Sequence, residues 1–279
     1  MNKTGLIIAL GIAAVVGLLF GFYPQLDLAI SRPFFAHTNA DHYTFAWRLS
    51  PSLMLVHNIA LRFGFLLVVP AVIVLVGKLL LPRRKMLISG RGVFFLIATM
   101  ALGPGLLVNV VLKDHWGRPR PIDVTQFGGQ QHFVAWWDPR GDCPGNCSFV
   151  SGDVATAAWA LAPAALAPPQ WRALAYGGAL ALTLGMTALR LMAGGHFFTD
   201  ATFAAIFTFL IIWIVHGLIY RWPRTRLSDR QVTRALERCS LLCCDAANWL
   251  GHRAADEIAG PEGGDENDPH IKRRRRGWW

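Results

Sequence analysis

Residues 92–112 read GVFFLIATMALGPGLLVNVVL, a predominantly apolar run that contains no charged side chain. As an α-helix, a run of about 20 such residues spans the hydrocarbon core of a bilayer. The chain has 279 residues, of which 53% are hydrophobic and 16% are charged, and its mean hydropathy is +0.37. Because roughly a quarter of the residues in soluble domains are charged, the sequence predicts an α-helical integral membrane protein.

Five further apolar blocks predict, together with this one, an all-α bundle of six membrane-spanning helices within residues 1–220. The other blocks are Gly5–Phe22, Phe63–Gly77, Val154–Pro169, Ala173–Leu189 and Ala201–Tyr220. Phe63–Gly77 extends to Leu81 if Lys78 snorkels to the interface, whereas Val154–Pro169 is short and rich in proline. No convincing cleavage site follows the first block, so we interpret it as a retained helix rather than a signal peptide.

The placement of basic residues predicts the orientation. The connections at every second helix boundary carry Lys or Arg, which the positive-inside rule places in the cytoplasm. These residues are Lys3, Arg83 to Lys85 with Arg91, Arg172, and Arg221 to Arg226. Both termini of the multi-pass chain are then cytoplasmic, and the expected location is a bacterial inner membrane. Residues 23–60, 113–150 and 190–200 face outward.

Residues 221–279 are predicted to form a cytoplasmic tail. Ser228 can cap an amphipathic helix over about residues 228–251, and the composition beyond Gly260 is typical of disorder. The chain ends in a basic run, residues 272–276, with two tryptophans close behind it, which suits either an anionic lipid surface or a solvated tail. No folded basic domain accompanies this run, so the net charge of +10 predicts no nucleic-acid partner.

Polar residues gather where three of the predicted helices meet the outward side. Charged side chains near membrane spans are costly and mark function by default. The third span is followed by Lys113 and Arg120, the fourth begins near Ser151, Gly152 and Asp153, the fifth ends at Arg190, and the sixth follows His196 and Asp200. Because the orientation is inferred from other residues, this common side is independent evidence for a single site.

The residue types at these helix ends predict a site for a phosphate group. Lys113, Arg120 and Arg190 supply three cations, and an arginine fork binds two phosphate oxygens at once. Ser151 and Gly152 would add backbone N–H groups at the start of a helix. Three cations suit a doubly charged group better than a neutral one.

His196 and Asp200 are four residues apart, which predicts that they share a helical turn and that the carboxylate accepts a hydrogen bond from the imidazole. A neutral imidazole among phosphate-binding cations is a suitable nucleophile toward phosphorus. The cations can stabilise charge on the phosphoryl oxygens, so we predict no metal ion and no cofactor. Four other histidines have no such neighbours in the sequence and are expected to be structural or interfacial: His57, His115, His132 and His216.

These residues resemble the signature of the type 2 phosphatidic acid phosphatase (PAP2) superfamily. One motif of that family, Lys, six residues, then Arg-Pro, is met by Lys113 and Arg120-Pro121. Another motif, Arg, five residues, His, three residues, Asp, is met by Arg190, His196 and Asp200. The resemblance implies a phospho-histidine intermediate on His196 and phosphate binding by the three cations.

The middle motif departs from the family. The usual Pro-Ser-Gly-His is replaced by Val150-Ser151-Gly152-Asp153, so the histidine expected to protonate the leaving group is missing. Asp153 could act as the general acid if burial raised its pKa, although the nearby cations act in the opposite direction. Residues 127–129 and 143–152 look like the bacterial branch that includes lipid A phosphatases. Cys143 and Cys147 can form a disulfide in an oxidising periplasm.

The sequence therefore predicts a metal-independent phosphoric monoester hydrolase that acts on a membrane lipid at the periplasmic face, with lipid A 1- or 4′-phosphate favoured. Alternatives are a phosphatase for polyprenyl diphosphate or phosphatidylglycerophosphate, and a lipid phosphotransferase. A different class is a non-catalytic lipid-phosphate binder, against which the retention of His196 and Asp200 argues. The oligomeric state does not follow from the sequence.

Overall fold

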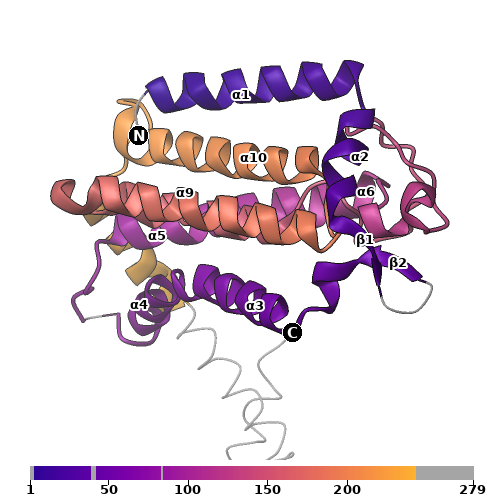
Figure 1. The fold of residues 1–279 in the computed structure, drawn as a ribbon. Coiled ribbons are helices and arrows are strands. Elements are labelled where there is room, and N and C mark those ends of the chain that lie inside the picture. The colour runs from indigo at the N-terminus through magenta and orange to yellow at the C-terminus, as the bar shows by residue number, and fades with distance from the viewer. Residues whose placement is uncertain (1–2, 39–41, 83, 243–279) are drawn as a thin grey trace, which may run out of the picture.

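The computed structural model describes residues 3–38, 42–82 and 84–242. Most of these residues are helical, and α1, α10 and α9 lie side by side (Figure 1). The long helices are α1 (Lys3–Phe22), α3 (Pro51–Leu66), α4 (Val69–Leu80), α5 (Gly90–Met100), α9 (Pro169–Met192) and α10 (Phe198–His216). π-Helical turns at Ala101–Leu112 join α5 to α6 (Lys113–His115), and similar turns at Gly217–Arg221 extend α10.

Five helical segments in the described part of the chain are long and apolar enough to cross a membrane. They are Lys3–Phe22, Pro51–Leu80, Gly90–His115, Pro169–Met192 and Phe198–Arg221. Each contains or overlaps one of the predicted blocks, because a long apolar run forms a helix wherever it meets lipid. The outer helices expose large apolar side chains, such as Ile7 and Val15 of α1 and Leu184 of α9. The chain is therefore a helical membrane protein.

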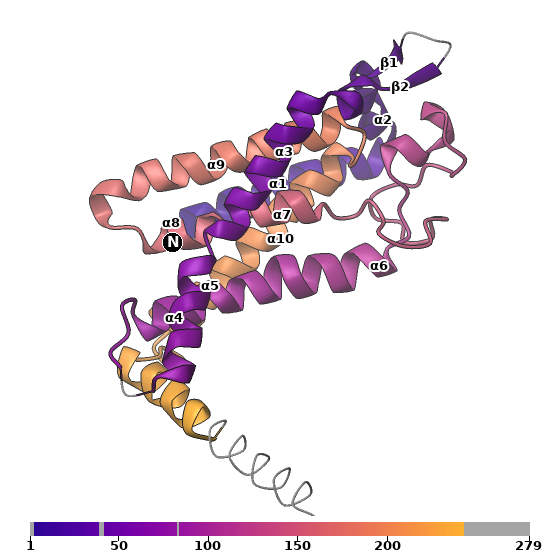
Figure 2. The ribbon, with the colours of Figure 1, turned by 90° about the horizontal axis from the view of Figure 1, so that it is seen from below.

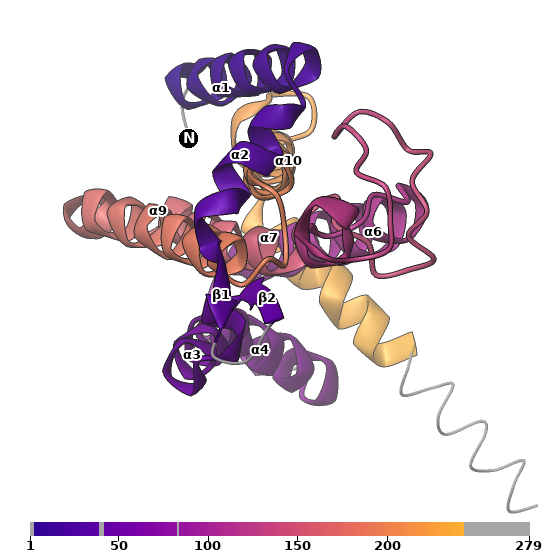
Figure 3. The ribbon, with the colours of Figure 1, turned by 45° about the vertical axis from the view of Figure 1, so that its right-hand side comes forward.

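The block Val154–Pro169, predicted to be a sixth span, is not one continuous helix, so the structure does not confirm the count of six. It forms two short helices in succession, α7 (Gly152–Ala158) and α8 (Leu161–Leu166), which carry the chain from the site end back to the start of α9 (Figure 2). α7 packs against α3, α9, α10 and the π-helical turns, and the oblique view in Figure 3 shows it near the centre of the bundle. Its alanines are small enough for the surrounding helices to approach closely. Residues 154–162 are apolar because they face protein, and the block becomes exposed only at its end, at Pro168 and Pro169.

The segments that carry the predicted site lie together at one end of the bundle (Figure 2). This end contains α2 (Gln25–Ser31) and an antiparallel hairpin of β1 (Phe35–Thr38) and β2 (His42–Phe45), with Phe35 opposite Phe45. Single 3₁₀ turns occur at Arg32–Phe34, Ala46–Leu49, Pro121–Asp123 and Thr125–Phe127. Buried Phe45, Phe127 and Phe197 pack the hairpin onto the long loop and the start of α10. The prediction that the polar clusters share one end is confirmed.

The opposite end carries the tail. Residues 229–242 are helical, and this helix packs back on the connection between α4 and α5. Nζ of Lys78, which is buried, lies 2.7 Å from a carboxylate oxygen of Glu237, and the backbone N–H of Arg91 donates to Asp229 at 3.0 Å. The remainder of the predicted tail helix, the predicted disorder and the basic residues 272–276 lie outside the described residues.

Replacing Ala155 by leucine tests the central position of α7. Ala155 is fully buried, so the added carbon atoms must displace neighbouring helices, which costs about 1–3 kcal/mol. We expect a lower thermal unfolding midpoint in detergent, followed by intrinsic tryptophan fluorescence. Ala173→Leu, at an exposed position of α9, is the matched control and should leave the midpoint unchanged. Equal midpoints for the two variants would contradict a buried α7.

Candidate active site

His196 lies in the short connection between α9 and α10 and is almost fully buried. Its Nδ1 atom is 2.7 Å from the carbonyl oxygen of Ser148. Because a carbonyl oxygen only accepts, Nδ1 carries the proton and Nε2 keeps its lone pair. Burial, followed by the charges of Arg190 and Arg120, lowers the pKa of His196 well below its ordinary value. The ring is therefore neutral at pH 7, in the tautomer that a nucleophile requires.

Asp200 supports His196 in a different way from the direct pairing that was predicted. α10 begins at Phe198, so His196 precedes the helix and the two residues do not share a helical turn. The Asp200 carboxylate accepts from the backbone N–H of Phe197 at 2.8 Å and from the hydroxyl of Ser148 at 2.5 Å. Ser148 therefore joins the two, since its hydroxyl donates to Asp200 and its carbonyl accepts from His196.

Arg118 is a buried cation that the sequence reasoning did not single out. Its guanidinium donates to Asp200, to the hydroxyl of Thr199 at 2.8 Å and to Oδ2 of Asp27 at 2.8 Å. The guanidinium also lies 4.5 Å from the centroid of the Phe197 ring. Asp27 accepts from both the backbone and the hydroxyl of Thr199. The network joins α2 and the long loop to the start of α10.

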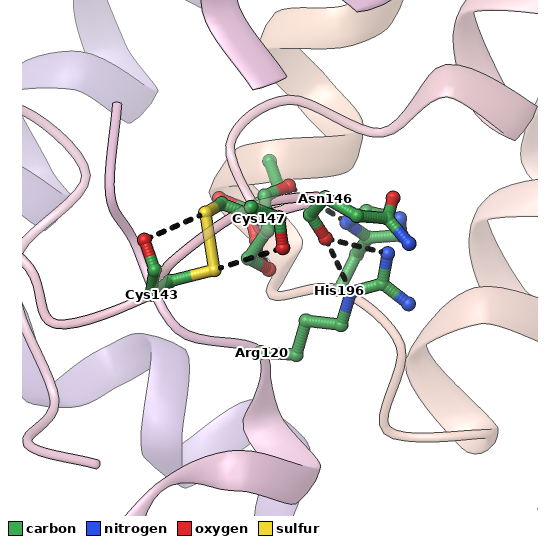
Figure 4. The surroundings of a disulfide bond; sticks show 8 residues. Arg120, Cys143, Asn146, Cys147 and His196 are labelled. Atoms are coloured by element: carbon green, nitrogen blue, oxygen red, sulfur yellow. Dashed lines mark hydrogen bonds between the residues drawn. A yellow bond between two sulfur atoms is a disulfide. The ribbon is translucent and has the colours of Figure 1, made fainter. Parts of the chain in front are cut away.

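Arg120 is held by the disulfide loop. Cys143 and Cys147 form a disulfide with a Cα–Cα distance of 5.8 Å, and the loop between them contains Asn146. Nε and Nη2 of Arg120 donate to the Asn146 carbonyl at 3.1 and 2.8 Å (Figure 4). The backbone N–H of Cys147 donates to the Lys113 carbonyl at 3.2 Å. The same short loop thus contacts two of the predicted phosphate-binding residues.

Arg190 occupies the last turn of α9, and its position depends on the glycine that precedes His196. Nε of Arg190 lies 3.2 Å from Oδ2 of Asp153. A Cβ atom at Gly195 would overlap the Arg190 guanidinium, so only glycine lets this side chain lie flat there. Lys113 lies near enough to Arg120, Asp153 and Arg190 for their charges to act on it.

Ser151 and Gly152 stand at the start of α7 as predicted, but Ser151 also makes hydrogen bonds within the protein. The Ser151 hydroxyl caps the helix by accepting from the backbone N–H of Val154 at 3.4 Å. The Ser151 N–H donates to the backbone carbonyl of Asp200 at 3.3 Å, so it is engaged within the protein. A Cβ atom at Gly152 would lie 2.6 Å from Oδ1 of Asn109, which explains a residue without a side chain.

A cavity of about 330 Å³ opens beside these residues. Its charged or titratable lining consists of Arg48, His57, Arg120 and Arg190, and Gly195 lies in its wall next to His196. The apolar lining consists of Trp47, Leu53, Met54, Leu189, Met192 and Ala193. A small set of polar groups in an otherwise apolar cavity is typical of a binding site for an amphiphilic ligand.

Asp153 lies in the first turn of α7 and is in contact with a histidine and an arginine. Its Oδ2 atom is 3.1 Å from Nε2 of His57 and 3.2 Å from Nε of Arg190. Both neighbours favour the ionised carboxylate over the protonated acid. These contacts therefore disfavour the general-acid role predicted for Asp153, and they bring His57, predicted to be structural, into the site.

The residues that sequence reasoning missed fall into two groups. Arg118 and Ser148 stand beside the quoted motifs, and their proximity to Arg120 and Ser151 was a usable signal. Three others come from the first 60 residues and belong to no motif: Asp27, Arg48 and His57. In the part of the chain that the structure describes, no three His, Cys, Asp or Glu side chains gather as a metal site; metal independence stays a prediction.

Comparison with known proteins agrees with this geometry. A family model described as the PAP2 superfamily matches residues 92–226. The lipid A 4′-phosphatase of Francisella tularensis subsp. novicida is 32% identical over 222 residues, covering 79% of this chain and 98% of that protein. The lipid A 4′-phosphatase of Rhizobium etli is 32% identical over 203 residues, covering 66% and 75%, respectively. No solved structure matches the chain.

The chain therefore belongs to the PAP2 superfamily. It is a membrane phosphatase, a hydrolase of phosphoric monoesters. The resemblance inferred from Lys113, Arg120, Arg190, His196 and Asp200 is confirmed at the level of the superfamily, and the lipid A phosphatases are among its relatives.

Gly195→Ala tests whether the Arg190 guanidinium needs the space above Gly195. The methyl group should displace the guanidinium and weaken the binding of vanadate, a phosphate mimic, by about 10-fold or more, because a hydrogen bond to a charged group contributes roughly 1.5–3 kcal/mol. Titration calorimetry in detergent measures the affinity. Gly145→Ala is the control, since a Cβ atom there meets no atom within 4 Å. Unchanged affinity in Gly195→Ala would rule out this positioning of Arg190.

The tautomer and charge of His196 can be observed directly. Because its pKa is lowered, protonation of the ring is displaced to more acidic pH, and the ring should still be neutral at pH 6.5. We expect ¹⁵N NMR of histidine-labelled protein in micelles to show the Nδ1-protonated neutral form, with His196→Gln identifying the signals. An imidazolium spectrum for His196 at pH 6.5 would contradict the assignment.

Proposed function

We propose that this chain hydrolyses a lipid A phosphomonoester, the 4′-phosphate in first place, through a phospho-histidine intermediate on His196. The site would face the periplasm of a bacterial inner membrane, with both termini in the cytoplasm. Residues 1–220 would form the phosphatase domain and residues 221–279 a cytoplasmic tail. The proposal rests on one observation above all: a buried, neutral His196 beside Arg120 and Arg190 at the end of the bundle that also contains the cavity.

The fixed cations suit the charge of the reaction. In phosphoryl transfer the charge spreads over the equatorial oxygens, so catalysis consists largely of positioning and electrostatic stabilisation. Arg120 and Arg190 line the cavity, and both act electrostatically on the nearby Lys113. Both side chains are partly buried, so water screens their attraction for a phosphate less than it would on an open surface.

His196 begins the reaction. Its Nε2 lone pair attacks phosphorus, the new N–P bond forms, and the ester P–O bond breaks with its electron pair remaining on the lipid oxygen. Nδ1–H of His196 keeps its bond to the Ser148 carbonyl, which stabilises the ring as positive charge develops. Water then attacks the phosphorus, the N–P bond breaks, and inorganic phosphate leaves.

Lipid A is favoured by two independent observations. The curated relatives named above are lipid A 4′-phosphatases, and the match to the Francisella protein covers nearly its whole length. The cavity combines guanidinium groups with exposed apolar residues such as Trp47 and Met54, which suits a phosphorylated headgroup that enters from a lipid layer. Polyprenyl diphosphate, phosphatidylglycerophosphate and transfer to a lipid hydroxyl are the competing chemistries.

His196→Ala tests the proposal. We expect the release of phosphate from lipid A in detergent micelles to fall by roughly 10³-fold or more, because removal of a covalent nucleophile removes the chemical route rather than binding. His115→Ala, an exposed histidine whose Nδ1 lies 3.1 Å from the Val110 and Val111 carbonyls, is the matched control. Undiminished phosphate release in His196→Ala would reject the phospho-histidine.

The substrate and the acceptor are tested separately with the unmodified chain. Phosphate release is compared for lipid A, phosphatidylglycerophosphate, phosphatidic acid and polyprenyl diphosphate, and the lipid product is analysed by mass spectrometry. We expect lipid A to lose its 4′-phosphate most rapidly. A phosphorylated acceptor lipid without free phosphate would indicate a transferase, and inactivity on all four would indicate a lipid-phosphate binder.

A further inference from the structure

We propose that His57 of α3 is the general acid that protonates the leaving oxygen, and that Asp153 is the positioning residue that orients it. The inference rests on the proposed phospho-histidine chemistry at His196 and adds the missing proton donor. A lipid or sugar alkoxide is a poor leaving group, so a positioned acid is worth about 10²–10⁴-fold in rate. The histidine that the family motif has at this position is replaced here by Asp153.

His57 is the suitable proton donor in the cavity lining. The other charged groups there, Arg48, Arg120 and Arg190, are arginines, which do not release protons in proteins. His196 is occupied as the nucleophile. An imidazole, by contrast, is the side chain that most often transfers protons in enzymes. His57 is half-buried, and it is one of the residues that line the cavity.

The contact with Asp153 fixes the role of each ring nitrogen. Nε2 of His57 lies 3.1 Å from Oδ2 of Asp153, and the same oxygen lies 3.2 Å from Nε of Arg190. A carboxylate that accepts from an imidazole holds the ring in one orientation and stabilises its protonated form. Nε2–H then points to Asp153, and Nδ1 is the atom that meets the leaving oxygen.

The packing of α3 on α7 brings these two residues together. Gly64, two helical turns after His57, lies against Thr156 of α7, and a Cβ atom at Gly64 would be 3.1 Å from Cγ2 of Thr156. His57 and Gly64 therefore lie on the same face of α3, and this face packs on α7. The close approach at Gly64 lets His57 reach Asp153, which is 96 residues later in the chain.

The proton and electron pairs balance over both steps. In the first step His196 attacks phosphorus, the ester P–O bond breaks, and the leaving oxygen takes the proton from the His57 imidazolium. In the second step neutral His57 removes a proton from water as the water oxygen bonds to phosphorus. The N–P bond breaks, its electron pair returns to Nε2 of His196, and His57 is again protonated.

The experiment compares leaving groups in His57→Gln. The substrates are an alkyl phosphomonoester and a series of aryl phosphomonoesters with the same alkyl chain and increasingly acidic phenols. We expect turnover of the alkyl ester to fall by about 100-fold or more, because the alkoxide needs the proton, and turnover of the most acidic phenol to fall much less. With that phenol, phosphorylated His196 should accumulate, because water is no longer deprotonated by His57. Asp153→Asn should give the same selectivity with a smaller loss.

The controls separate the two proposals. His132 forms a similar pair with Asp142 at 3.4 Å, but it is exposed, so His132→Gln should leave every substrate unchanged. His196→Ala should lose turnover of the whole series; turnover that survives in it would overturn the phospho-histidine. If His196→Ala is inactive but His57→Gln loses the same factor on all substrates, or loses nothing, the general-acid role of His57 is wrong.

Discussion

The buried guanidinium of Arg118 joins the parts of the site end of the molecule. An isolated charge in a protein interior is strongly unfavourable, and a partner removed from such a group leaves that cost uncompensated. Arg118 is paired with two buried carboxylates, Asp27 of α2 and Asp200 of α10. Segments far apart in the sequence are thereby held at one point. The orientation of Asp200, and through Ser148 that of His196, depends on this cluster.

Residues 146–148 carry this order from the buried cluster to the cavity. The carbonyl of Asn146 accepts from Arg120, the N–H of Cys147 donates to the helix end at Lys113, and Ser148 holds His196. A short loop closed by a disulfide has little conformational freedom to lose, so it can place several groups at once. The three backbone contacts explain why the cations and the imidazole meet, although they come from different helices.

The departure from the family motif at Asp153 has a physical counterpart in α3. The Asp153 carboxylate contacts Arg190 and His57, which both favour its ionised form. It is therefore suited to accept a hydrogen bond rather than to release a proton. In the proposed mechanism the imidazole comes from an earlier helix, and the carboxylate orients it. With aspartate at position 153 and histidine at position 57, the site still has two imidazoles. The buried ring of His196 is the nucleophile, and the half-buried ring of His57 is the acid.

The sequence by itself determined the membrane class, five of the spanning helices and the shared end of the polar clusters. These features follow from the length of each apolar run and from the Lys and Arg residues in the connections, which can be read without knowing any tertiary contact. It could not show that Val154–Pro169 is a buried pair of short helices, since apolar residues facing lipid and facing protein look alike. Only the tertiary structure decided which groups touch. Asp200 binds Arg118 and Ser148 instead of the nearby His196, and Asp153 meets His57 because α3 packs on α7, a contact that no local pattern encodes.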